Sequence, residues 1–153
     1  MPVFETSLVL PCQTAEVFDL QIQPAWVIQA MPPELSLRLI EAPERLSLGA
    51  RVVVSGRRWG VPHRATTEVT AFEPGRLIVE EQKQGPLRRW QMTQRFEVNA
   101  SGMLLTSRVE FEPPGGILGL TVTTASLQRE LEWVFGYRAD RLRDRFDLPE
   151  QAD

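Results

Sequence analysis

The sequence predicts an α+β fold in which a curved antiparallel sheet of about seven strands wraps around one long C-terminal helix. Two observations support this prediction. Segments rich in β-branched and apolar residues alternate with short Gly- and Pro-containing turns through the middle of the chain. After the Pro-Pro-Gly-Gly break at 113–116, apolar side chains recur at helical period, at Leu127, Leu131, Val134, Phe135, Leu142 and Phe146.

The C-terminal helix is predicted to run from about Ala125 to Phe146. Gly119 and the β-branched run 121–124 disfavour an earlier start. Glutamates come early in this segment and arginines late, which suits the helix dipole. At about 1.5 Å per residue such a helix crosses a small domain, and its apolar stripe needs an apolar surface to lie on.

The N-terminal third predicts one strand, two short helices and a second strand. The strand 3–10 stops at Pro11, and Thr14 caps a helix over 15–20. Pro24 suits the first turn of a second helix, which Pro32-Pro33 ends. Leucines then alternate with polar residues, which predicts a strand with one buried face at Leu35, Leu37 and Leu39.

Five further strands follow, separated by turns at Gly60, Pro74-Gly75, Gly85-Pro86 and 99–102. Short turns between consecutive strands imply antiparallel pairing. The expected ranges are about 51–59, 63–72, 77–83, 87–98 and 103–112.

Composition indicates one globular domain spanning 1–153. Hydrophobic residues make up 42% and charged residues 24%, so extensive disorder is not expected. A net charge of −3 gives no general attraction to nucleic acid, and no apolar run is long enough to span a membrane. We expect no signal peptide, and the single Cys12 fits a cytoplasmic location.

Three motifs, in this order and spacing, resemble the SRPBCC helix-grip superfamily. They are the segment from Gln82 through Gly85-Pro86 and Trp90 to Phe96, the Pro114-Gly115-Gly116 turn, and Phe135-x-x-Arg138. The superfamily groups START lipid-transfer domains, birch-pollen-type allergens, polyketide cyclases and coenzyme Q-binding proteins. The resemblance covers nearly the whole chain. It implies a cavity between sheet and C-terminal helix for an apolar or amphipathic small molecule.

The sequence departs from the pattern of these relatives at positions that would matter for catalysis. Histidines expected on the strand after Gly-Pro are replaced by Met92 or Gln94, and the acidic residue expected on the final strand is Ser107. If such a His–Asp pair carries out proton chemistry in relatives, this chain has lost it. We therefore predict no catalytic residues.

Strand alternation places Trp90, Met92 and Gln94 on one face, together with Phe96 and Val98, which we expect in the core. Ser107 shares a face with apolar neighbours on the last strand. A polar Gln94 and Ser107 on inward faces need partners. Either they orient a polar group of a ligand, or they bond to each other, to the backbone or to water.

Arg138 falls within the apolar stripe of the helix, so its guanidinium must pair, reach solvent or meet a ligand anion. Glu81 is the expected carboxylate partner, on a strand whose inward face we assign to Leu77 and Val79; Glu110 is a weaker alternative. A structural ion pair is favoured over ligand contact.

Three further residues are predicted to rim the mouth of the cavity. Trp59 and His63 flank a turn at one end of the sheet, and Trp26 precedes the Pro32-Pro33 break. Tryptophan suits an amphipathic lid, and His63, the only histidine, is the natural base near neutral pH. Core packing for the tryptophans and a surface position for His63 are the alternatives.

These residues favour a binding or transport protein for a hydrophobic small molecule such as a lipid, isoprenoid or polyketide-like compound. The alternative is a cyclase or dehydratase that uses Glu81, His63 and Arg138. A third hypothesis is an accessory module, or homodimer, that interacts through Trp133 and Tyr137 on the outer helix face. One histidine and one cysteine give little support for a metal site, and no motif calls for a cofactor or a nucleic-acid partner.

Overall fold

The computed structural model describes residues 1–146. Seven strands and three α-helices form the fold, with two short 3₁₀ helices in the connections. The strands are β1 (Val3–Leu10), β2 (Arg38–Glu41), β3 (Arg51–Arg58), β4 (Val61–Glu73), β5 (Leu77–Gln84), β6 (Arg89–Asn99) and β7 (Gly102–Glu112). The helices are α1 (Thr14–Gln21), α2 (Pro24–Gln29), η1 (Pro33–Leu35), η2 (Leu118–Leu120) and α3 (Thr124–Arg145).

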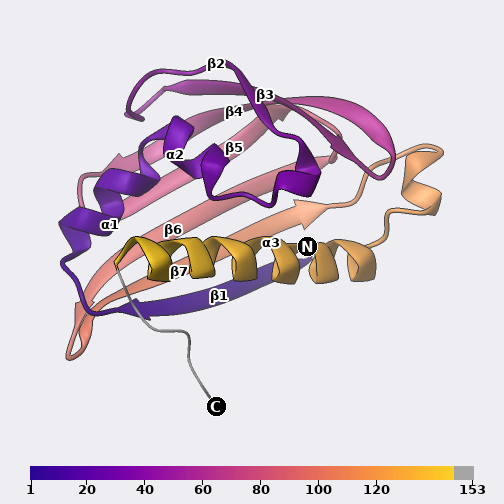
Figure 1. Ribbon diagram of the computed structural model, residues 1–153. Helices are drawn as coiled ribbons and strands as arrows, with labels where there is room; N and C mark the ends of the chain where they lie inside the picture. Colours follow the sequence, from indigo (N-terminus) through magenta and orange to yellow (C-terminus); the bar gives the residue numbers. More distant parts are fainter. Residues whose placement is uncertain (147–153) are drawn as a thin grey trace.

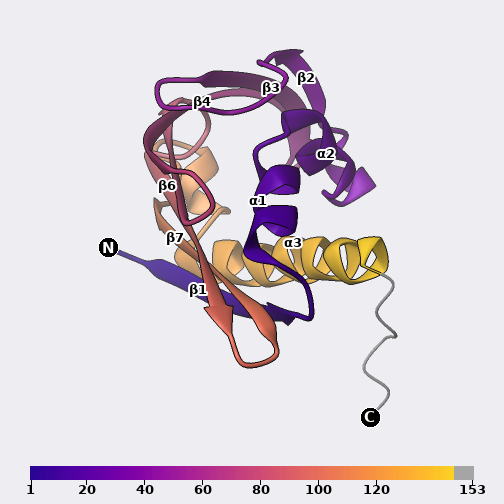
Figure 2. The ribbon, with the colours of Figure 1, turned by 90° about the vertical axis from the view of Figure 1, so that its left-hand side faces the viewer.

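All seven strands belong to one antiparallel sheet in the order β1-β7-β6-β5-β4-β3-β2. The six later strands form the expected meander, and β1 closes it by pairing with β7, with Phe4 opposite Val109. The sheet curls strongly, and all three α-helices lie on its concave side (Figures 1 and 2). The α+β fold predicted from the sequence is confirmed.

Helix α3 begins where the chain satisfies its first backbone amides. Thr123 Oγ1 accepts a hydrogen bond from the Ser126 amide at 3.2 Å, and Ser126 Oγ accepts one from the Thr123 amide at 2.9 Å. The expected apolar stripe is buried and faces the sheet, with Leu127 and Leu142 almost fully enclosed. The predicted helix therefore differs from the observed one by about a residue at each end.

Two local predictions are wrong. Leu35 does not begin a strand: it ends the 3₁₀ helix that the Pro32-Pro33 pair starts, Ser36 is left-handed (φ 49°), and strand β2 begins at Arg38. Val98 is not in the core but 81% exposed, because it sits at the β6–β7 turn beyond the edge of the helical layer.

In strand β5 the inward and outward faces are exchanged relative to the prediction, so the strand has the opposite phase. Ile78 is buried and begins the inward face, which continues through Glu80 and Gln82. Glu81 therefore points away from the interior, where Lys83 Nζ lies 3.7 Å from its carboxylate. The apolar run Leu77-Ile78-Val79 carries no alternation to set the phase.

The interior consists of two apolar clusters with polar side chains between them. One cluster packs α1 against the sheet around Phe18 and Phe96, and the other packs the first half of α3 around Phe111 and Leu131. Between them lie four buried polar residues, which we call the polar layer: Gln21, Gln94, Ser107 and Arg138. In the part of the chain described, no helix is long and apolar enough to cross a membrane.

Candidate ligand cavity

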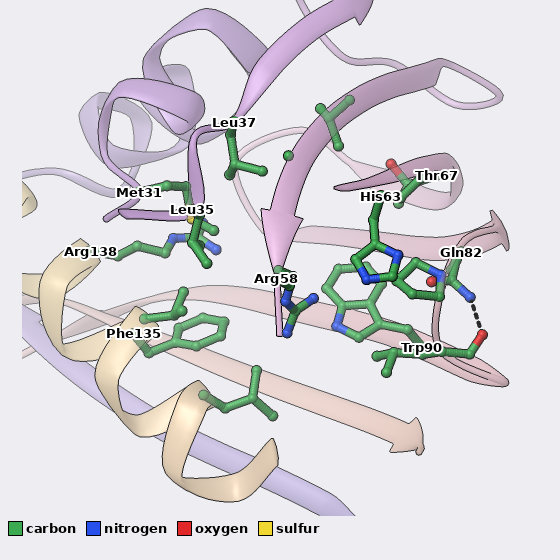
Figure 3. A pocket seen from close by; sticks show the side chains of 17 residues that line it. Met31, Leu35, Leu37, Arg58, His63, Thr67, Gln82, Trp90, Phe135 and Arg138 are labelled. Atoms are coloured by element: carbon green, nitrogen blue, oxygen red, sulfur yellow. Dashed lines mark hydrogen bonds between the residues drawn. The ribbon is translucent and has the colours of Figure 1, made fainter. Parts of the chain in front are cut away.

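A cavity of about 210 Å³ lies between the concave face of the sheet and helix α3, next to the second apolar cluster. Its wall comes from Met31, η1 and the segment after it, from the inward faces of β3 to β6 with the β5–β6 turn, and from one face of α3 (Figure 3). The lining residues are Met31, Leu35, Leu37, Val54, Gly56, Arg58, His63, Ala65, Thr67, Gln82, Pro86, Leu87, Trp90, Leu131, Val134, Phe135 and Arg138.

One glycine shapes the roof of this cavity. A Cβ on Gly56 of β3 would lie 2.7 Å from Leu37 Cδ2 and 2.9 Å from the Leu35 carbonyl oxygen. Glycine therefore lets the 35–37 segment pack closely against the sheet. As a result, Leu35 and Leu37 line the cavity, although the segment that contains them is not the predicted strand.

The β3–β4 hairpin is fastened to helix α3 at one end of the cavity. Arg58 Nε donates to Glu130 Oε1 at 3.0 Å, and Trp59 Nε1 donates to Glu130 Oε2 at 3.2 Å. The Arg58 guanidinium also stacks over the Trp59 ring, 4.5 Å from its centroid. We call these three residues the hairpin latch. It joins parts of the chain more than 70 residues apart in sequence.

The turn within this latch has unusual backbone geometry for its sequence. Both Trp59 (φ 55°) and Gly60 (φ 75°) are left-handed, as the two central residues of a tight hairpin turn require. Asparagine is the usual residue at the first of these positions, and a bulky aromatic there is strained. The contacts of the Trp59 side chain with Glu130 and His63 offset this strain.

His63 places an unbonded nitrogen in the cavity wall. Its ring packs edge-on against Trp59, with centroids 5.2 Å apart, and Nε2 is buried with no hydrogen-bond partner among the described residues. Burial lowers the pKa of His63, the Arg58 charge acts in the same direction, and a hydrogen bond to the Arg58 backbone partly offsets both. His63 is therefore neutral near pH 7. With the ring proton on Nδ1, toward the Arg58 backbone, Nε2 is a hydrogen-bond acceptor.

Arg138 lies at the opposite end of the cavity from His63, Gln82 and Trp90 (Figure 3). Its Nη2 donates to Gln21 Oε1 at 3.2 Å, Nη1 lies 3.9 Å from Met92 Sδ, and the guanidinium covers the Phe135 ring at 4.9 Å. Among residues 1–146, no carboxylate lies within ion-pair distance of it.

The carboxyl group that acts on Arg138 belongs to Glu80. Both residues line a small void of about 50 Å³ together with Gln21 and Gln94. Burial raises the pKa of Glu80 and Arg138 opposes the rise; burial lowers the pKa of Arg138 and Glu80 opposes that. The guanidinium remains charged, and its charge is only partly compensated by the protein.

The predicted site residues divide into three groups. His63, Trp90 and Arg138 line the cavity, and Trp59 packs beside it in the hairpin latch. Met92, Gln94 and Ser107 lie deeper: Met92 against Arg138, and Gln94 donating to Ser107 Oγ at 3.3 Å. The remaining two are outside the cavity: Trp26 packs on the first apolar cluster, and Glu81 is on the far side of the sheet.

The prediction that Glu81 is the partner of Arg138 is therefore wrong. Sequence reasoning also missed Arg58, Gln82 and Glu130, which the structure brings to the cavity or its rim. Gln82 would have followed from the correct phase of β5. Glu130 gives no local signal in the sequence, and only the folded hairpin shows its role.

The outer face of α3 leaves Trp133 43% exposed, while Arg141 stacks on Tyr137 at 5.3 Å. A homodimer through these aromatics stays a prediction. No group of three potential metal ligands occurs in the described part of the chain.

No protein-family model and no curated protein matches the sequence. Solved structures do match the fold. TTHA0849 from Thermus thermophilus superposes with a TM-score of 0.69 at 15% identity, covering 94% of this chain and 97% of that one. Ginseng major latex-like protein 151 from Panax ginseng gives 0.64 at 13%, covering 91% and 95%.

A further match is the di-domain ARO/CYC StfQ from the steffimycin biosynthetic pathway. It has a TM-score of 0.69 at 20% identity, over 92% of this chain and 48% of that protein. At these identities the matches show the fold alone. That fold is the helix-grip fold expected from the three sequence motifs.

Proposed function

We propose that this protein binds a hydrophobic small molecule in the cavity between the sheet and helix α3. The observation that carries the proposal is the cavity itself: about 210 Å³ of space that the side chains of residues 1–146 leave unfilled. Protein interiors are normally close-packed, and an unfilled interior forgoes contacts that would stabilise the fold. A ligand would supply those contacts.

The lining supports the proposal in its chemistry. Aliphatic and aromatic side chains predominate, and polar groups are few: in Figure 3, Arg138 lies at one end, His63 and Gln82 lie at the other, and Arg58 lies between them. This combination is typical of small-molecule sites, in which apolar contact provides affinity and sparse polar groups fix orientation.

The enzyme hypothesis retains two of its three residues in the cavity, His63 and Arg138, and loses Glu81. The observation in its favour is the neutral His63 with an unbonded Nε2, which is the form a general base needs. Within residues 1–146 no acidic side chain pairs with this imidazole, whose neighbours are the Arg58 backbone and the stacked Trp59 ring. Binding without chemistry accounts for the site with fewer assumptions.

The test uses 2-methylnaphthalene, an apolar probe with no hydrogen-bonding group, and a variant that fills the cavity. Ala65 on β4 lines the cavity, so Ala65→Leu should occupy it and weaken binding by about tenfold or more. The matched control is Val98→Leu at an exposed position. Saturable one-to-one binding, lost in Ala65→Leu and kept in Val98→Leu, supports the proposal. Equal binding to all three proteins, or to none, overturns it.

A further inference from the structure

The two ends of the cavity differ in hydrogen-bonding character, and this difference restricts the ligand. At the hairpin end, His63 Nε2 is a neutral acceptor with no partner in the described chain. At the inner end, Arg138 offers donors and positive charge. Buried polar groups are normally satisfied, so an unbonded acceptor in a cavity wall points to a ligand donor.

The donors at the inner end are likewise incompletely used. The guanidinium makes one hydrogen bond to an amide oxygen and one contact with a thioether, both weak partners for a cation. Glu80 does not complete it, since that carboxyl group lies beyond ion-pair distance and its burial favours the protonated form. The remaining N–H groups of the guanidinium can donate to a planar carboxylate or to a carbonyl oxygen.

The cavity volume restricts ligand size. A dry protein cavity of about 150 Å³ accommodates benzene, and drug-sized ligands occupy roughly 300 Å³ or more. At about 210 Å³, this cavity suits a molecule of one or two fused rings. Trp90 on β6 and Phe135 on α3 contribute aromatic surface to the lining. A long acyl or polyisoprenoid chain exceeds the available space.

We infer that the ligand is a compact cyclic molecule, of one or two rings, with a hydroxyl group that donates to His63 and a carboxylate or carbonyl group that accepts from Arg138. The inference rests on the proposed function and specifies its ligand class. In this arrangement the hydroxyl lies toward the hairpin latch and the carboxylate toward the polar layer. Affinity comes from the rings, and orientation comes from the two polar ends.

Four naphthalene probes test the two ends separately. 6-Hydroxy-2-naphthoic acid carries both groups, and 2-naphthol lacks the carboxylate. 2-Naphthoic acid lacks the ring hydroxyl, and 6-methoxy-2-naphthoic acid replaces it with an ether oxygen that cannot donate a hydrogen bond. The hydroxy acid should bind most tightly. Loss of the ring hydroxyl's O–H donor should weaken binding about 2- to 10-fold, and loss of the carboxylate should weaken it about 10- to 100-fold.

Substitutions at His63 and Arg138 show which residue binds the hydroxyl group and which binds the carboxylate. In His63→Phe, the hydroxy acid and 2-naphthoic acid should bind equally, while the preference for a carboxylate persists. His63→Gln, which keeps an acceptor, should retain part of the hydroxyl preference. In Arg138→Met, the hydroxy acid and 2-naphthol should bind equally, while the hydroxyl preference persists. If Arg138→Met does not fold, Arg138→Gln replaces it, and the wild-type ranking of the four probes still tests the ligand class.

The outcomes separate this inference from the proposed function. Equal affinity of all four probes, with 2-methylnaphthalene also bound, leaves the binding function intact and overturns the ligand class. A carboxylate preference that survives in Arg138→Met, or a hydroxyl preference that survives in His63→Phe, also overturns it. Failure of every probe, 2-methylnaphthalene included, overturns both.

Discussion

Arg138 of helix α3 donates a hydrogen bond to the amide oxygen of Gln21 in helix α1, at 3.2 Å, in the middle of the protein interior. This contact joins the long helix to the short helices across the polar layer. It is the one hydrogen bond from the buried guanidinium to an oxygen in the part of the chain described.

Removal of that acceptor should destabilise the protein. Gln21→Leu leaves a buried cation without its oxygen partner, and we expect the free energy of unfolding to fall by about 1.5–3 kcal/mol. Gln21→Glu, which keeps an acceptor, should cost less. The measurement is urea-induced unfolding.

A second substitution tests whether the loss acts through Arg138. The double variant Gln21→Leu with Arg138→Met has no buried cation, so its destabilisation should be smaller than the sum of the two single effects. Strict additivity would show that the two side chains do not depend on each other.

The hairpin latch should limit opening of the β3–β4 hairpin. Glu130→Ala removes both acceptors, and we expect the free energy of unfolding to fall by about 1–3 kcal/mol. Amide hydrogen exchange over residues 57–63 should accelerate, because the hairpin tip loses its contact with α3. Glu132→Ala, at an exposed position two residues away, is the control. Equal exchange rates in both variants would show that the hairpin latch does not limit opening of the hairpin.

His63 should make the stability of the protein depend on pH. Its pKa is lower in the folded protein than in the unfolded chain, where it is about 6.5. The unfolded chain therefore takes up a proton first as the pH falls. The contribution of His63 to stability is present above about pH 6.5 and is lost as the pH falls through the folded pKa.

A variant without a titrating side chain isolates this effect. From pH 7 to pH 5 the wild type should lose more stability than His63→Gln, which retains Arg58, Glu130 and Glu80 around the cavity. Since His63 is the only histidine, the difference between the two curves reports on this residue. Parallel curves, or a larger loss in the variant, would contradict the assigned pKa direction.

The architecture was predictable because its signals are local. Gly and Pro turns set the strand order, and the apolar stripe set the long helix almost to the residue. Apolar alternation was less reliable where no polar residue marked the phase. The run Leu77–Val79 led to Glu81 in place of Glu80, and the Leu35–Leu39 alternation concealed a 3₁₀ turn that Pro33 begins.

The site was only partly predictable because its key contacts join distant segments. Arg138 stood out as a charge within an apolar stripe, but its partner Gln21, at the end of a short helix, gives no signal in the sequence. Likewise, the Glu130 carboxylate binds two side chains more than 70 residues earlier, which no local pattern encodes. The Gln94–Ser107 pair was one of the alternatives foreseen, since two inward polar residues must find partners.

The methionine methyl groups provide the most direct test of ligand binding in the cavity. Met31 lines it, Met92 lies behind it against Arg138, Met103 is fully buried in the other cluster, and Met1 is exposed. In ¹³C-methyl spectra, addition of 2-methylnaphthalene should shift the Met31 signal most and leave Met103 and Met1 in place. An unmoved Met31 signal at saturating probe, or a shift confined to Met1, would show that the cavity is not the binding site.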